Sequence, residues 1–211
     1  MSKRIFAALA AVCLTAAQAT HAQETNAADP AAVEQVAVGT CAICHGPQGN
    51  SISPKFPVLA GQQPSYFVAQ LEAFKSQTRG DPDAMGYMWG MAAPLSETMM
   101  HGLADYYGKQ IPRAGAKGPA SLMARGAEIY QKGDASKGIP ACAACHGPHA
   151  GGNDTYPRLA GQHAQYLMKQ LRSFQNNMRD VAVMHGVASG LKGNDVEAVA
   201  VYLQSLGNKG E

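Results

Sequence analysis

Two copies of the pattern Cys-x-x-Cys-His contain four of the five cysteines in this 211-residue chain. The two thiols of such a motif can add to the vinyl groups of haem as thioethers, and the next residue, histidine, is close enough for its imidazole to reach the iron. The sequence therefore predicts two covalently attached haem c groups. The residues expected to hold them are Cys41, Cys44 and His45 in the first motif and Cys142, Cys145 and His146 in the second.

Two other chemistries use paired cysteines. Four cysteines in two pairs could bind zinc, but a zinc site gives no reason for a histidine directly after each pair. A dithiol oxidoreductase would place its Cys-x-x-Cys motif in a βαβ unit, and no such pattern surrounds either motif. Covalent haem accounts for the cysteines and the histidines together.

The N-terminus has the pattern of a secretory signal peptide. Lys3 and Arg4 precede an apolar run, and small residues follow up to Ala22, so we expect residues 1–22 to be removed on export. Cys13 lies within this segment, and the bulky Val12 before it argues against a lipoprotein site. No later segment has the roughly 20 apolar residues that a membrane-spanning helix needs. These features predict a soluble protein in the periplasm, where haem is attached to paired thiols.

The rest of the chain consists of two copies of one unit. The segment Pro-x-Leu-Ala-Gly-Gln begins at Pro57 and again at Pro157, and a tyrosine and an arginine follow it at matching distances in both copies. A stretch rich in glycine and proline, residues 109–120, separates the copies. We therefore predict two domains, residues 23–113 and residues 114–211.

Both copies are predicted to be helical. Asp29 and Pro30 supply an N-cap and a first-turn proline for a helix that runs into the first motif. Apolar residues recur at helical spacing in the other expected helices, and no segment alternates as a strand would, so the fold class is all-α. The expected helices are 121–131, 63–77, 163–177 and one after each of Leu95 and Leu191.

A haem iron held by one histidine needs a second axial ligand or stays open to small molecules. The chain has ten methionines, and methionine is often core filler. Within the repeated frame Met-x-Gly-x-Ala-x-x-Leu, Met88 and Met184 coincide, which selects them as ligands. Met85 is the alternative in the first copy, and His185 is a weaker candidate in the second.

Other repeated residues are expected near the haems. A ligating histidine usually donates its second ring N–H to a carbonyl, and the Pro-x-Leu loops are placed to provide one. Simple turn formation is the other reading of these prolines. The tyrosines and arginines could contact haem propionates or be ordinary half-buried residues. The positions concerned are Pro57, Leu59, Tyr66 and Arg79 and their counterparts Pro157, Leu159, Tyr166 and Arg179.

Taken together, these repeated motifs resemble the cytochrome c4 family, periplasmic dihaem electron carriers. The resemblance covers residues 30–206. It implies two class I cytochrome c domains related by a pseudo-twofold axis, with the haems adjacent at the interface. It also implies that His45 and Met88 bind one iron and that His146 and Met184 bind the other. Lys192 departs from the family, which commonly has serine there to cap the last helix.

The resemblance implies a non-enzymatic carrier of single electrons, which takes them from a membrane-bound quinol-oxidising complex to a haem-copper terminal oxidase. The alternative is an electron-transfer subunit of a periplasmic dehydrogenase or a dihaem peroxidase. Residues 23–113 hold 5 basic and 8 acidic residues, a balance of −3, whereas residues 114–211 hold 10 and 7, a balance of +3. This split could orient the molecule on its partners at the membrane surface. Nucleic acid binding is not expected, because it favours a strongly basic chain.

Overall fold

The computed structural model describes residues 27–207, and in this range the chain forms helices and loops without a strand. Two isolated β-bridges, Asp134 with Ile139 and Asn153 with Tyr156, are the extended pairings found there. The predicted all-α class is confirmed. The predicted signal peptide, residues 1–22, lies outside the described residues.

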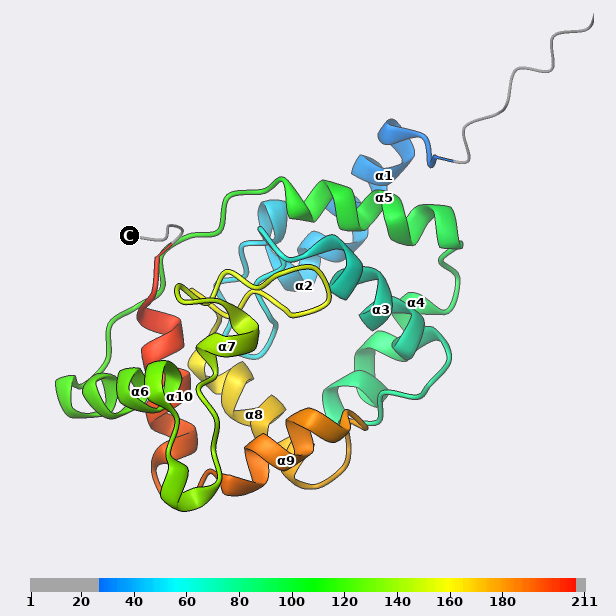
Figure 1. The fold of residues 1–211 in the computed structure, drawn as a ribbon. Helices are drawn as coiled ribbons and strands as arrows, with labels where there is room; N and C mark the ends of the chain where they lie inside the picture. The colour runs from blue at the N-terminus through cyan, green and yellow to red at the C-terminus, as the bar shows by residue number, and fades with distance from the viewer. Residues whose placement is uncertain (1–26, 208–211) are drawn as a thin grey trace, which may run out of the picture.

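The two halves of the chain share the order of their main helices but differ in their π- and 3-10 helices (Figure 1). The first half contains α1 (Pro30–Val36), the π-helix η1 (Ala37–Cys41), α2 (Ala42–His45), the 3-10 helix η2 (Pro47–Gly49), α3 (Pro64–Lys75), the π-helix η3 (Ala84–Met88), α4 (Trp89–Ala92) and α5 (Glu97–Gly108). The second half contains α6 (Ala120–Lys132), the 3-10 helix η4 (Ala135–Lys137), α7 (Ala143–His146), α8 (Ala164–Gln175), α9 (Ala182–Gly190) and α10 (Asp195–Ser205).

Local sequence explains where several of these helices begin. The Asp29 carboxylate accepts a hydrogen bond from the Ala31 amide at 3.0 Å, and Pro30 opens α1. The Ser96 hydroxyl caps α5 by accepting from the Met99 amide at 3.1 Å. Helix α10 begins beyond Lys192 and has no side-chain cap at Asn194. The effect of Lys192 on this helix start stays a prediction.

Each half has an apolar core of its own. One core combines α1, α3 and α5 around the fully buried Leu103 and Tyr107, and the other combines α6, α8 and α10 around Ile129 and Tyr130. No buried residue of one core belongs to the other within residues 27–207. Two cores of this kind accord with two domains, whose boundary at residues 113 and 114 stays a prediction.

In each half the first and last long helices cross at a glycine. A Cβ on Gly102 of α5 would lie 2.5 Å from Val33 Cγ2 of α1, and one on Gly126 of α6 would lie 2.1 Å from the Ala198 carbonyl oxygen of α10. Real Cβ atoms do not approach so closely, so both crossings need a residue without a side chain at that point. The crossings fix how each half closes around its motif.

Candidate haem sites

The two Cys-x-x-Cys-His motifs have the same environment in both halves. The first cysteine of each motif, Cys41 or Cys142, is half-buried, and the second, Cys44 or Cys145, is exposed. The histidines that follow, at the ends of α2 and α7, are both 7% exposed. A thiol at the surface and an imidazole facing inward suit a flat group that is attached at its edge and ligated at its centre.

Each histidine is oriented by the carbonyl that the sequence predicted. Nδ1 of His45 donates to the Pro57 oxygen at 2.9 Å, and Nδ1 of His146 donates to the Pro157 oxygen at 3.1 Å. Burial lowers the pKa of both imidazoles, although the proline carbonyl opposes this shift. A neutral ring with its proton on Nδ1 presents the Nε2 lone pair, which is the form that binds a metal.

The Pro-x-Leu loops are tied to the segments that follow the histidines. The Leu59 amide donates to the Gly49 oxygen at 2.8 Å, and the Leu159 amide donates to the Ala150 oxygen at 2.9 Å. Both leucine side chains pack against the core of their own half. The proline carbonyl two residues before each leucine is therefore held at a fixed position relative to the histidine.

The two selected methionines occupy equivalent places after the third helix of each half. Met88 ends η3 and packs against the first core, and Met184 lies in α9; both are half-buried. Met85, the alternative, is 48% exposed. His185 uses Nδ1 to bond the Phe174 oxygen at 2.8 Å. The assignment of Met88 and Met184 as iron ligands stays a prediction.

The predicted arginines and tyrosines meet across the interface between the halves. Arg79 donates to Gln170 at 2.9 Å and to the Tyr166 hydroxyl at 3.2 Å. Arg179 donates to Gln70 at 2.9 Å and to the Tyr66 hydroxyl at 3.2 Å. Each arginine also donates at 2.8 Å to the glutamine of its own half, so each amide oxygen accepts from both guanidinium groups. This reciprocity is the pattern of a pseudo-twofold axis.

The electrostatics of this interface are dominated by the arginines. Burial favours the neutral phenol of Tyr66, but the charges of Arg179 and Arg79 outweigh burial and hold the pKa of Tyr66 below its usual value. Arg79 is also paired with the buried Asp81 carboxylate at 2.7 Å. Contacts of these arginines and tyrosines with haem propionates stay a prediction.

Comparisons with known proteins agree with this arrangement. The family model described as "Cytochrome c" matches residues 123–207. Cytochrome c4 of Azotobacter vinelandii is 40% identical over 183 residues, which cover 82% of this chain and 87% of the relative. The chain belongs to the cytochrome c4 family. The solved structure of reduced recombinant cytochrome c4 from Pseudomonas stutzeri superposes with a TM-score of 0.74 at 37% identity, covering 85% of this chain and 100% of that one.

Another relative has a different name. A protein from Thiomonas intermedia named "Thiosulfate dehydrogenase electron acceptor" is 36% identical over 172 residues, covering 78% of this chain and 77% of that protein. Membership of the cytochrome c4 family confirms the two tandem class I domains, and it makes this protein an electron carrier with two covalent haem c groups at its two motifs. No helix within residues 27–207 has the length and apolar character needed to cross a bilayer.

The interior of this cytochrome c4 fits the two haem groups. Arg158 Nε and Gln170 Nε2 are buried donors that have no partner in the described part of the chain, and a buried donor without a partner costs about 1–3 kcal/mol. Among the described residues, Asp81 is the one carboxylate that pairs with the arginines at the interface. Haem propionates would supply acceptors and negative charge of the kind that these groups lack.

Three residues near the cytochrome c4 motifs were not singled out by sequence reasoning. Arg158 lies between Pro157 and Leu159, and burial lowers its pKa. Gln62 and Gln162 end the repeated Pro-x-Leu-Ala-Gly-Gln segments and are 9% and 6% exposed. Their repetition was visible in the sequence, but nothing local indicated that each glutamine reaches into the other half.

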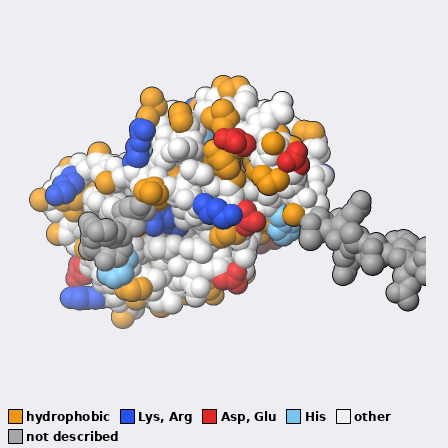
Figure 2. Space-filling view, turned by 90° about the horizontal axis from the view of Figure 1, so that it is seen from above, with side chains coloured by type: hydrophobic (Ala, Val, Ile, Leu, Met, Phe, Trp, Pro, Cys, Tyr) orange, Lys and Arg blue, Asp and Glu red, His pale blue; other side chains and the backbone are white. Residues whose placement is uncertain are grey.

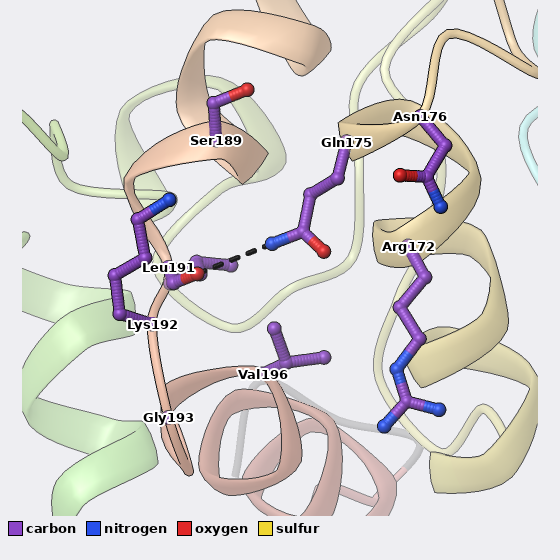
Figure 3. A pocket seen from close by; sticks show the side chains of 8 residues that line it. All are labelled: Arg172, Gln175, Asn176, Ser189, Leu191, Lys192, Gly193 and Val196. Atoms are coloured by element: carbon purple, nitrogen blue, oxygen red, sulfur yellow. Dashed lines mark hydrogen bonds between the residues drawn. The ribbon is translucent and has the colours of Figure 1, made fainter.

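A separate hollow lies on the second half of the molecule, between α8, the end of α9 and the start of α10 (Figure 3). Gln175 spans it and donates to the Leu191 oxygen at 3.2 Å. Arg172 and Lys192 give it a positive charge. None of the predicted haem-binding residues lines this hollow, so it is distinct from the haem sites.

Proposed function

We propose that this protein is exported to the periplasm and carries single electrons from a membrane-bound quinol-oxidising complex to a haem-copper terminal oxidase. The observation that supports this most is the repeated pair of bonds from His45 to Pro57 and from His146 to Pro157. Two histidines that are oriented in the same way to bind iron, one in each half, suit the passage of an electron between two haems rather than chemistry on a substrate.

In this proposal His45 and Met88 are the axial ligands in the first half, and His146 and Met184 are those in the second. The proline carbonyls fix the imidazole planes and raise their basicity. Bound haem supplies one-electron chemistry, and thioether ligation favours the ferrous state relative to a second histidine. The cores of the two halves exclude water and hold both ligands in place during the change of oxidation state.

The decisive experiment follows electrons through the purified holoprotein. We expect a reductive titration to take up two electrons per chain, with low-spin spectra in both oxidation states. Membranes that contain a haem-copper oxidase should then reoxidise the protein rapidly. Turnover of hydrogen peroxide by the protein alone, together with a high-spin haem, would instead support a dihaem peroxidase and contradict the proposal.

A second candidate is an electron-accepting subunit or partner of a periplasmic dehydrogenase. The relative from Thiomonas intermedia, by its name, accepts electrons from thiosulfate dehydrogenase. Reduction of this protein by thiosulfate in the presence of such an enzyme, at a rate above that with a quinol-oxidising complex, would favour this candidate. The carrier role is common to both, and only the donor differs.

The uneven charge supports two different docking faces. On the face shown in Figure 2, most Lys and Arg side chains lie on the left and in the centre of the view, and most Asp and Glu side chains lie toward the right. We propose that one half receives electrons and the other delivers them.

Asp81 and Asp83 are not suitable targets for a test of docking, because Asp81 is buried against Arg79 and Asp83 pairs with Lys169. Because surface charges are screened over roughly 8 Å at physiological ionic strength, reversing the exposed Lys132 and Lys192 should change the salt dependence of oxidase reduction far more than reversing the exposed Glu72 and Glu97. Equal responses would contradict this assignment of faces.

A further inference from the structure

Each half of the molecule carries a glutamine that binds the histidine-orienting loop of the other half. Gln162 accepts from the Val58 amide at 2.9 Å and donates to the Val58 oxygen at 2.9 Å. Gln62 accepts from the Arg158 amide at 2.8 Å and donates to the Arg158 oxygen at 3.1 Å. Each side-chain amide thus forms hydrogen bonds with both the backbone N–H and the backbone carbonyl of one residue.

The residue bound by the glutamine, Val58 or Arg158, directly follows the proline whose carbonyl accepts a hydrogen bond from the histidine. The Pro57 carbonyl and the Val58 N–H belong to one peptide group. His45 Nδ1 donates to the Pro57 oxygen of that peptide group at 2.9 Å. The Val58 N–H of the same group donates to Gln162 Oε1 at 2.9 Å. The same chain runs from His146 through the peptide between Pro157 and Arg158 to Gln62.

Hydrogen bonds in such a chain polarise one another. A peptide whose N–H is already donating has a more negative carbonyl oxygen, which strengthens the bond from Nδ1 by about 10–30%. A stronger bond at Nδ1 makes the imidazole a better donor to ferric iron. Both glutamines are buried, so water does not compete at either end of the chain.

We propose that Gln62 and Gln162 are crossed positioning residues, each of which tunes the reduction potential of the haem in the opposite half. This inference rests on the proposed ligation of iron by His45 and His146. The potential of each haem then depends on contact between the halves, because the glutamine that completes each chain of hydrogen bonds belongs to the opposite half. Loss of a glutamine removes the polarising bond and raises the potential of the opposite haem.

The test is a redox titration of the full holoprotein. The oxidation state of each haem is monitored through haem-methyl proton resonances that are assigned to the two halves. We expect Gln162→Leu to raise the reduced-to-oxidised ratio of the first-half haem about two- to fivefold at fixed potential, which is about 18–41 mV for a one-electron couple. The second-half haem should be unchanged. Gln62→Leu should give the mirror result, and the Nδ1 proton of the opposite histidine should exchange faster with solvent.

Two further variants separate tuning from loosening of the interface. Gln63 donates to the Gly151 oxygen of the other half at 2.8 Å, and among the described residues its side chain has no hydrogen bond to either proline peptide, so Gln63→Leu should leave both potentials unchanged. Gln162→Glu keeps an acceptor for the Val58 amide and should hold the first-half potential at or below that of the parent. Shifts in the same half as the substitution, no shift, or equal shifts with Gln63→Leu would overturn the proposal. Low-spin histidine signals from the parent protein check the underlying ligation independently.

Discussion

Replacing Arg79 with methionine should destabilise the protein more than the same change at Arg179. The two arginines make matching bonds to the interface glutamines and tyrosines, and each lies over a phenylalanine, with the guanidinium carbon 4.6 Å or 4.4 Å from the ring centre. Arg79 alone also pairs with Asp81, through side chains that are 7% and 3% exposed. Removing one member of a buried pair costs about 3–5 kcal/mol, because the other charge is left without a partner. Losing bonds to neutral acceptors costs about 1–3 kcal/mol.

The difference can be measured by guanidinium denaturation followed by far-ultraviolet circular dichroism. We expect Arg79→Met to lower the free energy of unfolding by about 2 kcal/mol more than Arg179→Met. Adding Asp81→Asn to Arg79→Met should restore part of the loss, with a coupling of about 1–3 kcal/mol. Equal losses from the two arginine variants, or strictly additive losses in the double variant, would refute the reasoning that the carboxylate makes the two sites unequal.

Three other predictions concern the ligands, acid stability and one glycine. Met88→Ala and Met184→Ala should each abolish about half of the sulfur-to-iron charge-transfer absorption and open one haem to carbon monoxide; a parent-like spectrum would exclude that methionine as a ligand. Hydrogen bonds from a serine and an arginine lower the pKa of Asp134 to about 2, and lysine and arginine bonds to Asp195 outweigh burial and lower its pKa too. A carboxyl group whose pKa is lowered on folding stabilises the folded state at pH values above its pKa in the unfolded chain. This stability should therefore be lost as the pH falls from about 4 to 2. Urea midpoints should show that loss, and Asp134→Asn should flatten it. Finally, Gly152 has a φ of +76° and no room for a Cβ beside the loop that carries the histidine-binding carbonyl, so Gly152→Ala should cost at least about 1–2 kcal/mol in thermal or urea denaturation.

Sequence reasoning identified what depends on short-range pattern. The Cys-x-x-Cys-His motifs predicted the attachment sites, and the carbonyl partners of His45 and His146 were named from the repeated prolines. The Asp29 cap follows the same logic, because a cap is decided by residues within one turn of the helix.

The interface could not be predicted in the same way. A repeat shows that two units are alike, but it does not show which surfaces meet or which side chain crosses between them. The arginines were expected either to contact haem propionates or to be ordinary half-buried residues, and the structure places them against glutamines of the opposite half. The hydrogen bonds between Gln162 and Val58 join residues that are far apart in the chain. Helical or strand periodicity carries no information about such a pair.

The glycine crossings described for the two halves bear on how such a duplicated protein can evolve. In the first half the small residue is on the last helix, at Gly102, and in the second it is on the first helix, at Gly126. A hybrid domain with α1 against α10 would set Val33 against Ala198, with no glycine at the crossing. The reverse hybrid, with α6 against α5, would set Gly126 against Gly102 and leave a void between the two helices. The first and last helices of each copy are therefore matched to one another at the crossing, and we expect a hybrid domain made by exchanging one of these helices between the copies to be less stable than either copy.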